Sequence, residues 1–353
     1  MLKILKISSQ GTKMTNTING FGFIEYSSNN PDDLDKLFRQ LGFSAIKKHK
    51  TKDITLYRQG GIDFMLNRTI NSFAHDFRNE HGPCANGFSI VFDDAQAALE
   101  HAVKNGSETI TGDLDLPAVK GIGGAVLYIV DKPNYKNLLE NDFDAIVGMN
   151  QYPTGWGMTF IDHLTHNVFY GSMEKWGKYY VDLFQFEQIR YFDIKGSQTG
   201  LTSKAMRSPN GSVKIPLNES PDKKSQINEY IDEYNGEGIQ HIALYTENIY
   251  ETIESIKAAG VDFLVTPETY YSIIDKRVTK HEEDIPRLQK NSILIDADEE
   301  TGEKILLQIF TQNCIGPIFF EIIQRKGNQG FGEGNFQALF DSIELDQKRR
   351  GFL

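Results

Sequence analysis

Apolar and polar residues alternate in four short segments of the chain, and each segment is followed by a stretch with a different spacing. The four segments are 21–26, 87–92, 161–168 and 239–245. Alternation with a period of two is typical of a strand with one buried face, whereas apolar residues at i, i+3 and i+4 indicate an amphipathic helix. The sequence therefore predicts one unit, a strand followed by a helix and further strands, repeated four times.

Polar residues and glycines mark the ends of the four predicted helices. Acidic and amide side chains favour the start of a helix, and glycine favours its end. The first helix begins after Asn30-Pro31 and ends at Gly42. The other three lie between Asp94 and Asn105, from about Met173 to Leu183, and between Asn248 and Gly260.

Four such units predict an α+β fold with two open barrel-like domains, each made of two strand–helix–three-strand modules. Gly148, Pro153, Gly155 and Gly157 mark a connecting stretch between the two halves. We therefore expect one domain over 1–150 and a second over 151–353. Short turns between consecutive strands favour mixed or antiparallel sheets that curl around a pocket over a doubly wound sheet.

Composition narrows the class of protein. A net charge of −11, with acidic and basic residues interspersed, argues against nucleic acid and anionic membranes as partners. The two cysteines, Cys84 and Cys314, argue against a disulfide framework and fit a reducing compartment. The apolar run in the first ten residues is too short and too interrupted by Lys3 and Lys6 for a signal peptide, and no apolar stretch approaches the roughly 20 residues of a membrane helix. We expect a cytoplasmic enzyme or binding protein.

Three side chains with metal-binding chemistry interrupt apolar runs in the second half. They are His163 in I-D-H-L-T-H-N-V, His241 in G-I-Q-H-I-A-L and Glu321 in G-P-I-F-F-E-I-I-Q. Two imidazoles and one carboxylate are the protein ligands of the facial triad that holds ferrous iron. A buried carboxylate among phenylalanines is costly without a partner, and a divalent cation would remove that cost. We interpret the three residues as Fe(II) ligands, which makes the second domain catalytic and the first metal-free.

The alternative is that both histidines are core residues bonded to backbone groups and that Glu321 pairs with Arg325 or Lys326. Aligning the two halves argues against it, because the three residues fall at equivalent positions of the repeat. The aligned pairs are Phe23 with His163, Phe88 with His241, and Tyr128 with Glu321. We expect the three ligands to meet inside the second barrel and the three aromatic residues to meet inside the first.

Strand alternation separates the neighbouring histidine from this row. His166 lies three positions after His163, so its side chain points to the other side of the strand. We expect His166 to face solvent or to support the ligands from behind.

Several polar side chains of the second half stand next to apolar residues. They are Ser203, Asn218, Gln226, Gln240 and Gln308. Buried amides and hydroxyls need hydrogen-bond partners, and a small molecule with oxygens at both ends would supply them. Each of the five could instead be satisfied by the protein itself.

The motifs around these residues closely resemble the C-terminal half of the 4-hydroxyphenylpyruvate dioxygenase family, within the vicinal-oxygen-chelate superfamily. They are I-D-H-L-T-H-N-V, L-T-S-K-A-M, I-P-L-N-E, N-G-E-G-I-Q-H-I-A, G-P-I-F-F-E-I-I-Q-R-K-G and G-F-G-E-G-N-F-Q-A-L-F. The resemblance extends from about residue 20 to the end of the chain and is strong from residue 158 onward.

The resemblance implies a role for each candidate residue. It implies Fe(II) on His163, His241 and Glu321, and a C-terminal helix over 335–353 that covers the site. The implied substrate-binding residues are Ser203, Asn218, Gln226, Gln240, Gln308, Phe310, Phe331 and Phe336, of which Gln226, Gln308 and Phe336 also take part in catalysis. The glyoxalase-like fold of that superfamily has the same strand–helix–strands modules as those predicted above.

The implied reaction converts 4-hydroxyphenylpyruvate and O2 to homogentisate and CO2 in tyrosine breakdown, in a homodimer or homotetramer. One alternative is 4-hydroxymandelate synthase, but Phe336 stands where a smaller aliphatic residue would be expected. A second alternative is a metal-free ligand-binding protein of the superfamily, and the intact triad argues against it. A third is an extradiol ring-cleaving dioxygenase, which needs an acid–base histidine, and His166 is the local candidate.

Overall fold

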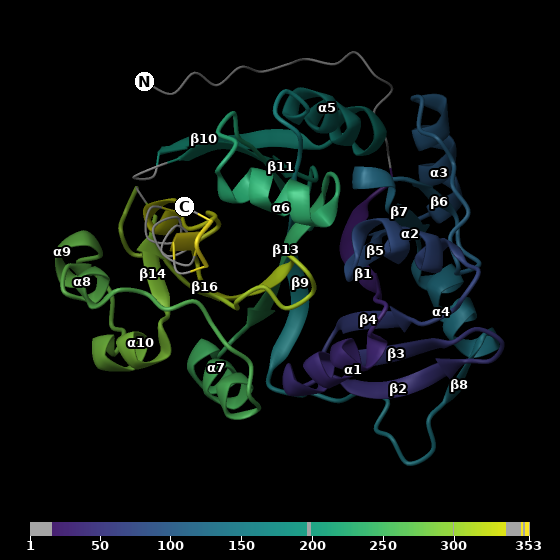
Figure 1. The fold of residues 1–353 in the computed structure, drawn as a ribbon, viewed down its shortest axis with the longest axis horizontal. Helices are drawn as coiled ribbons and strands as arrows, with labels where there is room; N and C mark the ends of the chain where they lie inside the picture. The colour runs from purple at the N-terminus through teal and green to yellow at the C-terminus, as the bar shows by residue number, and fades with distance from the viewer. Residues whose placement is uncertain (1–15, 196–198, 299, 337–346, 349, 353) are drawn as a thin grey trace.

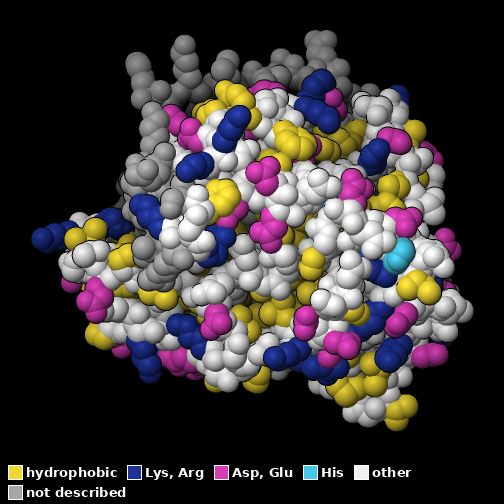
Figure 2. Space-filling view, in the orientation of Figure 1, with side chains coloured by type: hydrophobic (Ala, Val, Ile, Leu, Met, Phe, Trp, Pro, Cys, Tyr) yellow, Lys and Arg dark blue, Asp and Glu magenta, His cyan; other side chains and the backbone are white. Residues whose placement is uncertain are grey.

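Two curled sheets of eight strands, flanked by helices, make up the chain (Figure 1). The structure is a computed structural model that describes residues 16–195, 199–298, 300–336, 347–348 and 350–352. The predicted α+β fold with two barrel-like halves is confirmed. On the face in Figure 2, acidic and basic side chains are interspersed. No helix among the described residues has the length and apolar composition needed to cross a membrane.

The first sheet has strand β1 (Ile18–Ser27) near its centre, between a parallel and an antiparallel neighbour. In spatial order its strands are β6 (Ala118–Lys120), β7 (Val126–Val130), β5 (Cys84–Phe92), β1, β4 (Ile62–Asn67), β3 (Ile54–Gln59), β2 (Ser44–His49) and β8 (Phe143–Ala145). The helices of this half are α1 (Pro31–Gln40), α2 (Phe73–His81), α3 (Ala95–Lys104) and α4 (Lys132–Asn141), with a 3-10 turn, η1, at Ile122–Gly124.

The second sheet repeats this arrangement around strand β9 (Met158–Asn167). Its order is β10 (Glu187–Lys195), β11 (Gly200–Arg207), β12 (Lys214–Glu219), β9, β13 (Gly238–Thr246), β16 (Phe319–Lys326), β15 (Ile305–Phe310) and β14 (Leu294–Ala297). The helices are α5 (Met173–Phe184), α6 (Gln226–Tyr234), α7 (Ile249–Ala258), α8 (Glu268–Tyr271), α9 (Ile274–Arg277) and α10 (Ile285–Asn291), with a 3-10 turn, η2, at Glu333–Asn335.

The four predicted strand–helix pairs are β1–α1, β5–α3, β9–α5 and β13–α7. Two of these helices, α3 and α7, begin with a side-chain cap, whereas the side chains of Asn30 and Ser172 make no capping hydrogen bond to α1 and α5. The side chain of Asp94 accepts a hydrogen bond from the backbone N–H of Ala97, and that of Asn248 accepts one from Glu251. These bonds satisfy backbone donors that have no partner within the first turn of a helix.

The core joins the two halves. One hydrophobic cluster contains buried residues of both sheets, and a smaller cluster belongs to the first half. The rings of Phe64 on β4 and Phe320 on β16 stack with centroids 5.8 Å apart. Because Phe320 is adjacent to Glu321, the first half packs against the strand that carries this candidate ligand.

Phe23, Phe88 and Tyr128 were predicted to meet inside the first half, and two of the three do. Phe23 and Tyr128 lie with ring centroids 5.3 Å apart, but Phe88 belongs to the larger cluster. Register explains the error. Ile24 pairs with Phe88 as Leu164 pairs with Ile242, so the position equivalent to His241 is Gly87. A slip of one residue turns a side chain to the other face of a sheet.

Gly87 leaves room for the aromatic ring that replaces the carboxylate ligand. A β-carbon built on Gly87 would lie 3.0 Å from the ring of Tyr128. In the first half Phe23, Gly87 and Tyr128 therefore occupy the positions of His163, His241 and Glu321.

Candidate metal centre and pocket

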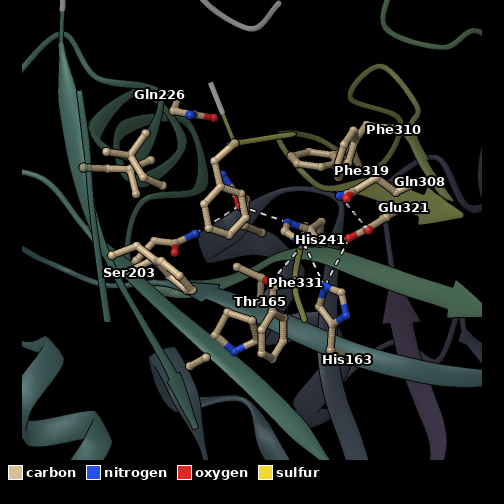
Figure 3. Close-up of a pocket in the computed structure, with 18 residues that line it drawn as sticks. His163, Thr165, Ser203, Gln226, His241, Gln308, Phe310, Phe319, Glu321 and Phe331 are labelled. Carbon is tan, nitrogen blue, oxygen red and sulfur yellow. Dashed lines mark hydrogen bonds and ion pairs between the residues drawn. The ribbon is translucent and has the colours of Figure 1, made fainter. Parts of the chain in front are cut away.

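Three adjacent strands bring the candidate ligands together. His163 lies on β9, His241 on β13 and Glu321 on β16, and Ala243 of the middle strand is paired with both His163 and Glu321. The Nε2 atoms of the two histidines are 3.4 Å apart. Glu321 Oε2 lies 3.1 Å from Nε2 of His163 and 3.5 Å from Nε2 of His241. All three side chains are buried, and they point toward one another at one end of a pocket (Figure 3).

A β-bulge lies immediately before each histidine. In the pairing of β9 with β13, Asp162 is an extra residue on one strand and Gln240 is an extra residue on the other. Bulges change the direction of neighbouring side chains and are frequent beside active sites. Here each extra residue reaches the ring that follows it: Asp162 Oδ1 is 2.9 Å from Nδ1 of His163, and Gln240 Oε1 is 3.0 Å from Nδ1 of His241.

These contacts determine which ring nitrogens remain for a metal. An oxygen acceptor beside Nδ1 places the proton there and leaves the lone pair on Nε2. The hydroxyl of Thr165 lies 2.9 Å from Nε2 of His241, where it can donate to that lone pair. Gln308 Nε2 donates to Oε1 of Glu321 at 3.2 Å, which leaves Oε2 facing the histidines. Three atoms with lone pairs therefore converge.

The electrostatics of the cluster suit a cation. Burial by itself would raise the pKa of Glu321, but the two histidines, His163 above all, lower that pKa to about 2. Burial would also lower the pKa of His163, yet Glu321 and Asp162 raise it. Burial lowers the pKa of His241. Glu321 is therefore an anion at neutral pH, and its convergence with two imidazole nitrogens fits a divalent transition metal.

Asp162 is a second buried anion, behind the first histidine. Its side chain is 1% exposed, and Arg325 binds it with two hydrogen bonds of 2.7 Å. Lys214 Nζ lies 3.6 Å from the same carboxylate. Burial alone would raise the pKa of Asp162, but Arg325, His163 and Lys214 hold it well below its usual range.

The pocket extends from the ligands across the inside of the second sheet. Apart from the ligands, its lining comprises Thr165, Phe192, Ile194, Leu201, Ser203, Ala205, Pro216, Asn218, Gln226, Gln240, Gln308, Phe310, Phe319, Phe331 and Phe336. All eight residues expected to bind substrate are in this lining, together with the three expected metal ligands. Their individual roles remain predictions.

The end of the pocket away from the ligands is polar. Ser203 on β11 is paired in register with Asn218 on β12, and Gln226 begins α6 nearby (Figure 3). Asn218 Nδ2 lies 3.4 Å from Oδ1 of Asn167 and 3.5 Å from Oε1 of Gln240. These long contacts connect the polar end to the bulge residue that supports His241.

Phe331 and Phe336 belong to the segment that follows β16. The rings of Phe331 and His163 form a T-shaped pair with centroids 5.6 Å apart, and those of Phe336 and Phe192 form another at 4.9 Å. Between them, buried Asn335 accepts a hydrogen bond of 2.7 Å from the hydroxyl of Tyr270 and donates one of 3.1 Å to Gln308. The predicted C-terminal helix over 335–353 falls largely on 337–346, 349 and 353, which lie outside the described residues.

Thr165, Phe192 and Phe319 line the pocket but were not predicted from the sequence. The ring of Phe319 stacks on His241 with centroids 4.9 Å apart. Thr165 stands two residues after His163, and Phe319 stands two residues before Glu321. Strand alternation puts residues with this separation on one face, so it contained the signal for both.

The expectation that His166 faces solvent or supports the ligands is wrong. His166 is fully buried and hydrogen-bonds at 2.7 Å to the hydroxyl of Tyr180, on helix α5. It lies outside the pocket lining, and burial lowers its pKa to about 3. It is therefore a neutral core residue, which removes the acid–base group that extradiol ring cleavage needs.

Comparisons with known proteins agree with this architecture. Residues 14–144 match the family model described as hydroxyphenylpyruvate dioxygenase, HPPD, N-terminal. Residues 160–272 match the Glyoxalase/Bleomycin resistance protein/Dioxygenase superfamily. The chain is 50% identical to hemolysin VllY of Vibrio vulnificus, over 95% of this chain and 96% of that protein. It is 47% identical to a 4-hydroxyphenylpyruvate dioxygenase of Legionella pneumophila, over 95% of this chain and 97% of that protein.

A solved structure has a similar fold. A mutant of 4-hydroxymandelate synthase from Streptomyces coelicolor superposes with a TM-score of 0.82, over 94% of this chain and 99% of that chain. Its sequence is 21% identical to this one, so the likeness shows the fold alone.

Proposed function

The chain belongs to the 4-hydroxyphenylpyruvate dioxygenase family, and we propose that it converts 4-hydroxyphenylpyruvate and O2 to homogentisate and CO2 in tyrosine breakdown. The observation that carries the proposal is the convergence of His163, His241 and Glu321 at one end of a buried pocket with a polar far end. We propose Fe(II) as the metal, because this donor set is that of the ferrous facial triad.

The metal end of the pocket would receive the 2-oxo acid head of the substrate. When bound, Fe(II) supplies a Lewis acid for the carboxylate and keto oxygens and a centre for the activation of O2. The described lining residues include no lysine or arginine, so a metal on the three ligands would supply the positive charge for the substrate carboxylate. Asp162, Gln240 and Gln308 hold the ligands in orientation through the hydrogen bonds given above.

The polar end would hold the phenol hydroxyl of the substrate. Ser203, Asn218 and Gln226 offer one hydroxyl and two amides there, which can both donate and accept. Anchoring both ends of an extended molecule restricts its rotation in the pocket, and such positioning is a large contribution to catalysis.

Phenylalanines would enclose the substrate ring between these two ends. Phe310, Phe319, Phe331 and Phe336 line the pocket, and phenyl rings hold an aromatic substrate through edge and offset contacts. They also exclude water, which protects reactive species from side reactions.

We propose further that residues 1–150 form a metal-free supporting domain and 151–353 the catalytic one. The support for this division is that Phe23, Gly87 and Tyr128 occupy the ligand positions in the first half. A homodimer or homotetramer remains a prediction, which light scattering on the purified protein would test.

The proposal is tested by anaerobic addition of Fe(II) and 4-hydroxyphenylpyruvate to the purified protein, followed by O2. We expect a charge-transfer absorption before oxygen and homogentisate after it. Formation of 4-hydroxymandelate would instead identify the sister activity, against which the bulk of Phe336 argues. Absence of both metal binding and product would favour a ligand-binding protein and contradict the proposal.

A further inference from the structure

Arg325 connects a metal-site histidine to the segment that carries Phe331. On one side, its Nε and Nη2 atoms donate to the two oxygens of Asp162, each at 2.7 Å. On the other side, its Nη1 donates to the backbone carbonyls of Asn328 at 3.2 Å and Gly330 at 2.5 Å. One guanidinium therefore binds both the carboxylate behind His163 and the loop that follows β16.

The same two parts meet again inside the pocket. Asp162 contacts Nδ1 of His163, and the ring of Phe331 forms a T-shaped pair with that of the same histidine. Gly330, whose carbonyl Arg325 holds, immediately precedes Phe331. These contacts form a closed circuit from Arg325 through Asp162 and His163 to Phe331, and back through Gly330. We therefore expect Arg325 to influence the position of Phe331 relative to His163.

The loop has a second anchor on its far side. Asn335 binds Gln308 and the hydroxyl of Tyr270, and Gly332 passes close to Gln308 with a φ of 76°. A β-carbon at Gly332 would lie 1.8 Å from Oε1 of Gln308. The segment 327–336 is thus held at one end by Arg325 and by the hydrogen bond of 3.1 Å from Asn328 Nδ2 to the carbonyl of Lys304, and at the other end by Asn335, with Phe331 between them.

Lysine cannot replace arginine in this arrangement. A guanidinium presents a planar fork that binds a carboxylate with two parallel bonds and still has a third nitrogen to donate, whereas an ammonium is a compact charge on a flexible chain. The side chain of Arg325 is 6% exposed and that of Asp162 is 1% exposed, so solvent does little to weaken the pair.

We propose that Arg325 is a positioning residue that aligns the segment 327–336 with His163, so that Phe331 and Phe336 are in place over the substrate ring. Its catalytic consequence rests on the proposed function, but its structural consequence does not. Loss of Arg325 would loosen the segment, while Lys214 remains beside Asp162 and Asp162 remains beside Nδ1 of His163.

The test compares Arg325→Lys and Asp162→Asn with the wild-type protein in two measurements. The first is hydrogen–deuterium exchange of peptides covering 327–336 in the metal-free protein, where we expect roughly tenfold faster exchange in both variants. The second is the yield of homogentisate per O2 consumed, which we expect to fall roughly twofold because the ring is no longer fixed. Affinity for Co(II), a spectroscopic probe of the metal site, should change little in Arg325→Lys.

Arg58→Lys is the matched control, because Arg58 makes a mostly buried two-bond contact with Asp63 in the first half of the chain. This variant should leave unchanged both the hydrogen–deuterium exchange of 327–336 and the yield of homogentisate per O2 consumed. Thermal melts would identify a variant that fails to fold, and the other variant then carries the test.

Unchanged exchange in a folded variant would overturn the proposal. Strictly additive effects on exchange when Arg325→Lys and Asp162→Asn are combined in one protein would also overturn it. Two residues that act through one contact give a combined effect smaller than the sum of the single effects. If the wild-type protein makes no homogentisate, the proposed function fails, while the exchange comparison still decides the role of Arg325.

Discussion

Oε1 of Gln240 lies 3.0 Å from Nδ1 of His241, the residue that follows it in the chain. Side chains of consecutive strand residues normally point to opposite faces, and the β-bulge at Gln240 is what allows this contact. The same device joins Asp162 to His163 on the neighbouring strand. Each histidine is therefore oriented by its own predecessor, one by an amide and the other by a carboxylate.

Gln240→Leu should weaken metal binding by roughly 10–100-fold, the usual effect of losing a group that orients a metal-binding histidine. Leucine has a similar size but no acceptor for the Nδ1 proton. Titration of the metal-free protein with Co(II) measures the change. Gln240→Glu keeps an acceptor oxygen and should retain most of the affinity, and equal losses in both variants would contradict the orienting role.

Glu321→Gln should abolish or greatly reduce both metal binding and turnover. The pKa of Glu321 is lowered to about 2, so the wild-type residue supplies a full negative charge at neutral pH, and glutamine supplies none. Iron content after anaerobic loading and homogentisate formation are the two measurements. Gln289→Glu, on the exposed surface, is a control for interchanging glutamine and glutamate away from the metal site. Full activity of Glu321→Gln would exclude it as a ligand.

Phe336→Leu and Phe336→Ile should shift the product from homogentisate toward 4-hydroxymandelate. Phe336 lines the pocket and forms a T-shaped pair with Phe192, so a smaller side chain gives the substrate ring room to move away from the oxidising centre. The benzylic carbon would then be oxidised in place of the ring. Chromatography of the products measures the ratio, and homogentisate as the sole product would show that Phe336 does not position the ring.

Strand spacing predicted the repeat, and buried charge pointed to the triad. Polar side chains in apolar surroundings pointed to five further residues of the pocket lining, whereas Phe310, Phe331 and Phe336 were expected only from the family resemblance. The bulges were not predictable, because no residue type marks them: they appear only when the two strands are paired. They do not explain why the sequence alignment placed Phe88, in place of Gly87, opposite His241, since the bulge at Gln240 has a counterpart at Asn86. That error arose because two short apolar strands can be aligned one residue apart, and only the pairing with the neighbouring strand fixes the register. His166 was predicted to point away from the ligands, but the sequence did not show that Tyr180 of α5 covers that side of β9.

The first half contains its own buried polar cluster, at positions equivalent to the metal pocket. Glu25 is fully buried and accepts hydrogen bonds from the hydroxyl of Tyr128 at 2.9 Å and from Nδ2 of Asn67 at 2.7 Å. Asn67 also donates to Asp113 at 2.8 Å. Burial, together with the charge of Asp113, raises the pKa of Glu25 from 4.5 to about 7, although the hydrogen bonds oppose the change.

This raised pKa makes the stability of the metal-free protein depend on pH. A carboxyl group with a higher pKa in the folded state contributes stability that is fully present below pH 4.5 and is lost as the pH rises to about 7. Glu25→Gln stays neutral and keeps the acceptor for Asn67. Relative to the wild-type protein it should therefore gain on the order of 3 kcal/mol at pH 8 and little at pH 4.5. Urea unfolding at the two pH values measures the difference, with the exposed Glu80→Gln as control. An equal effect of Glu25→Gln at both pH values would contradict the raised pKa. It would show that the Glu25 carboxylate stays charged in the folded protein over this pH range.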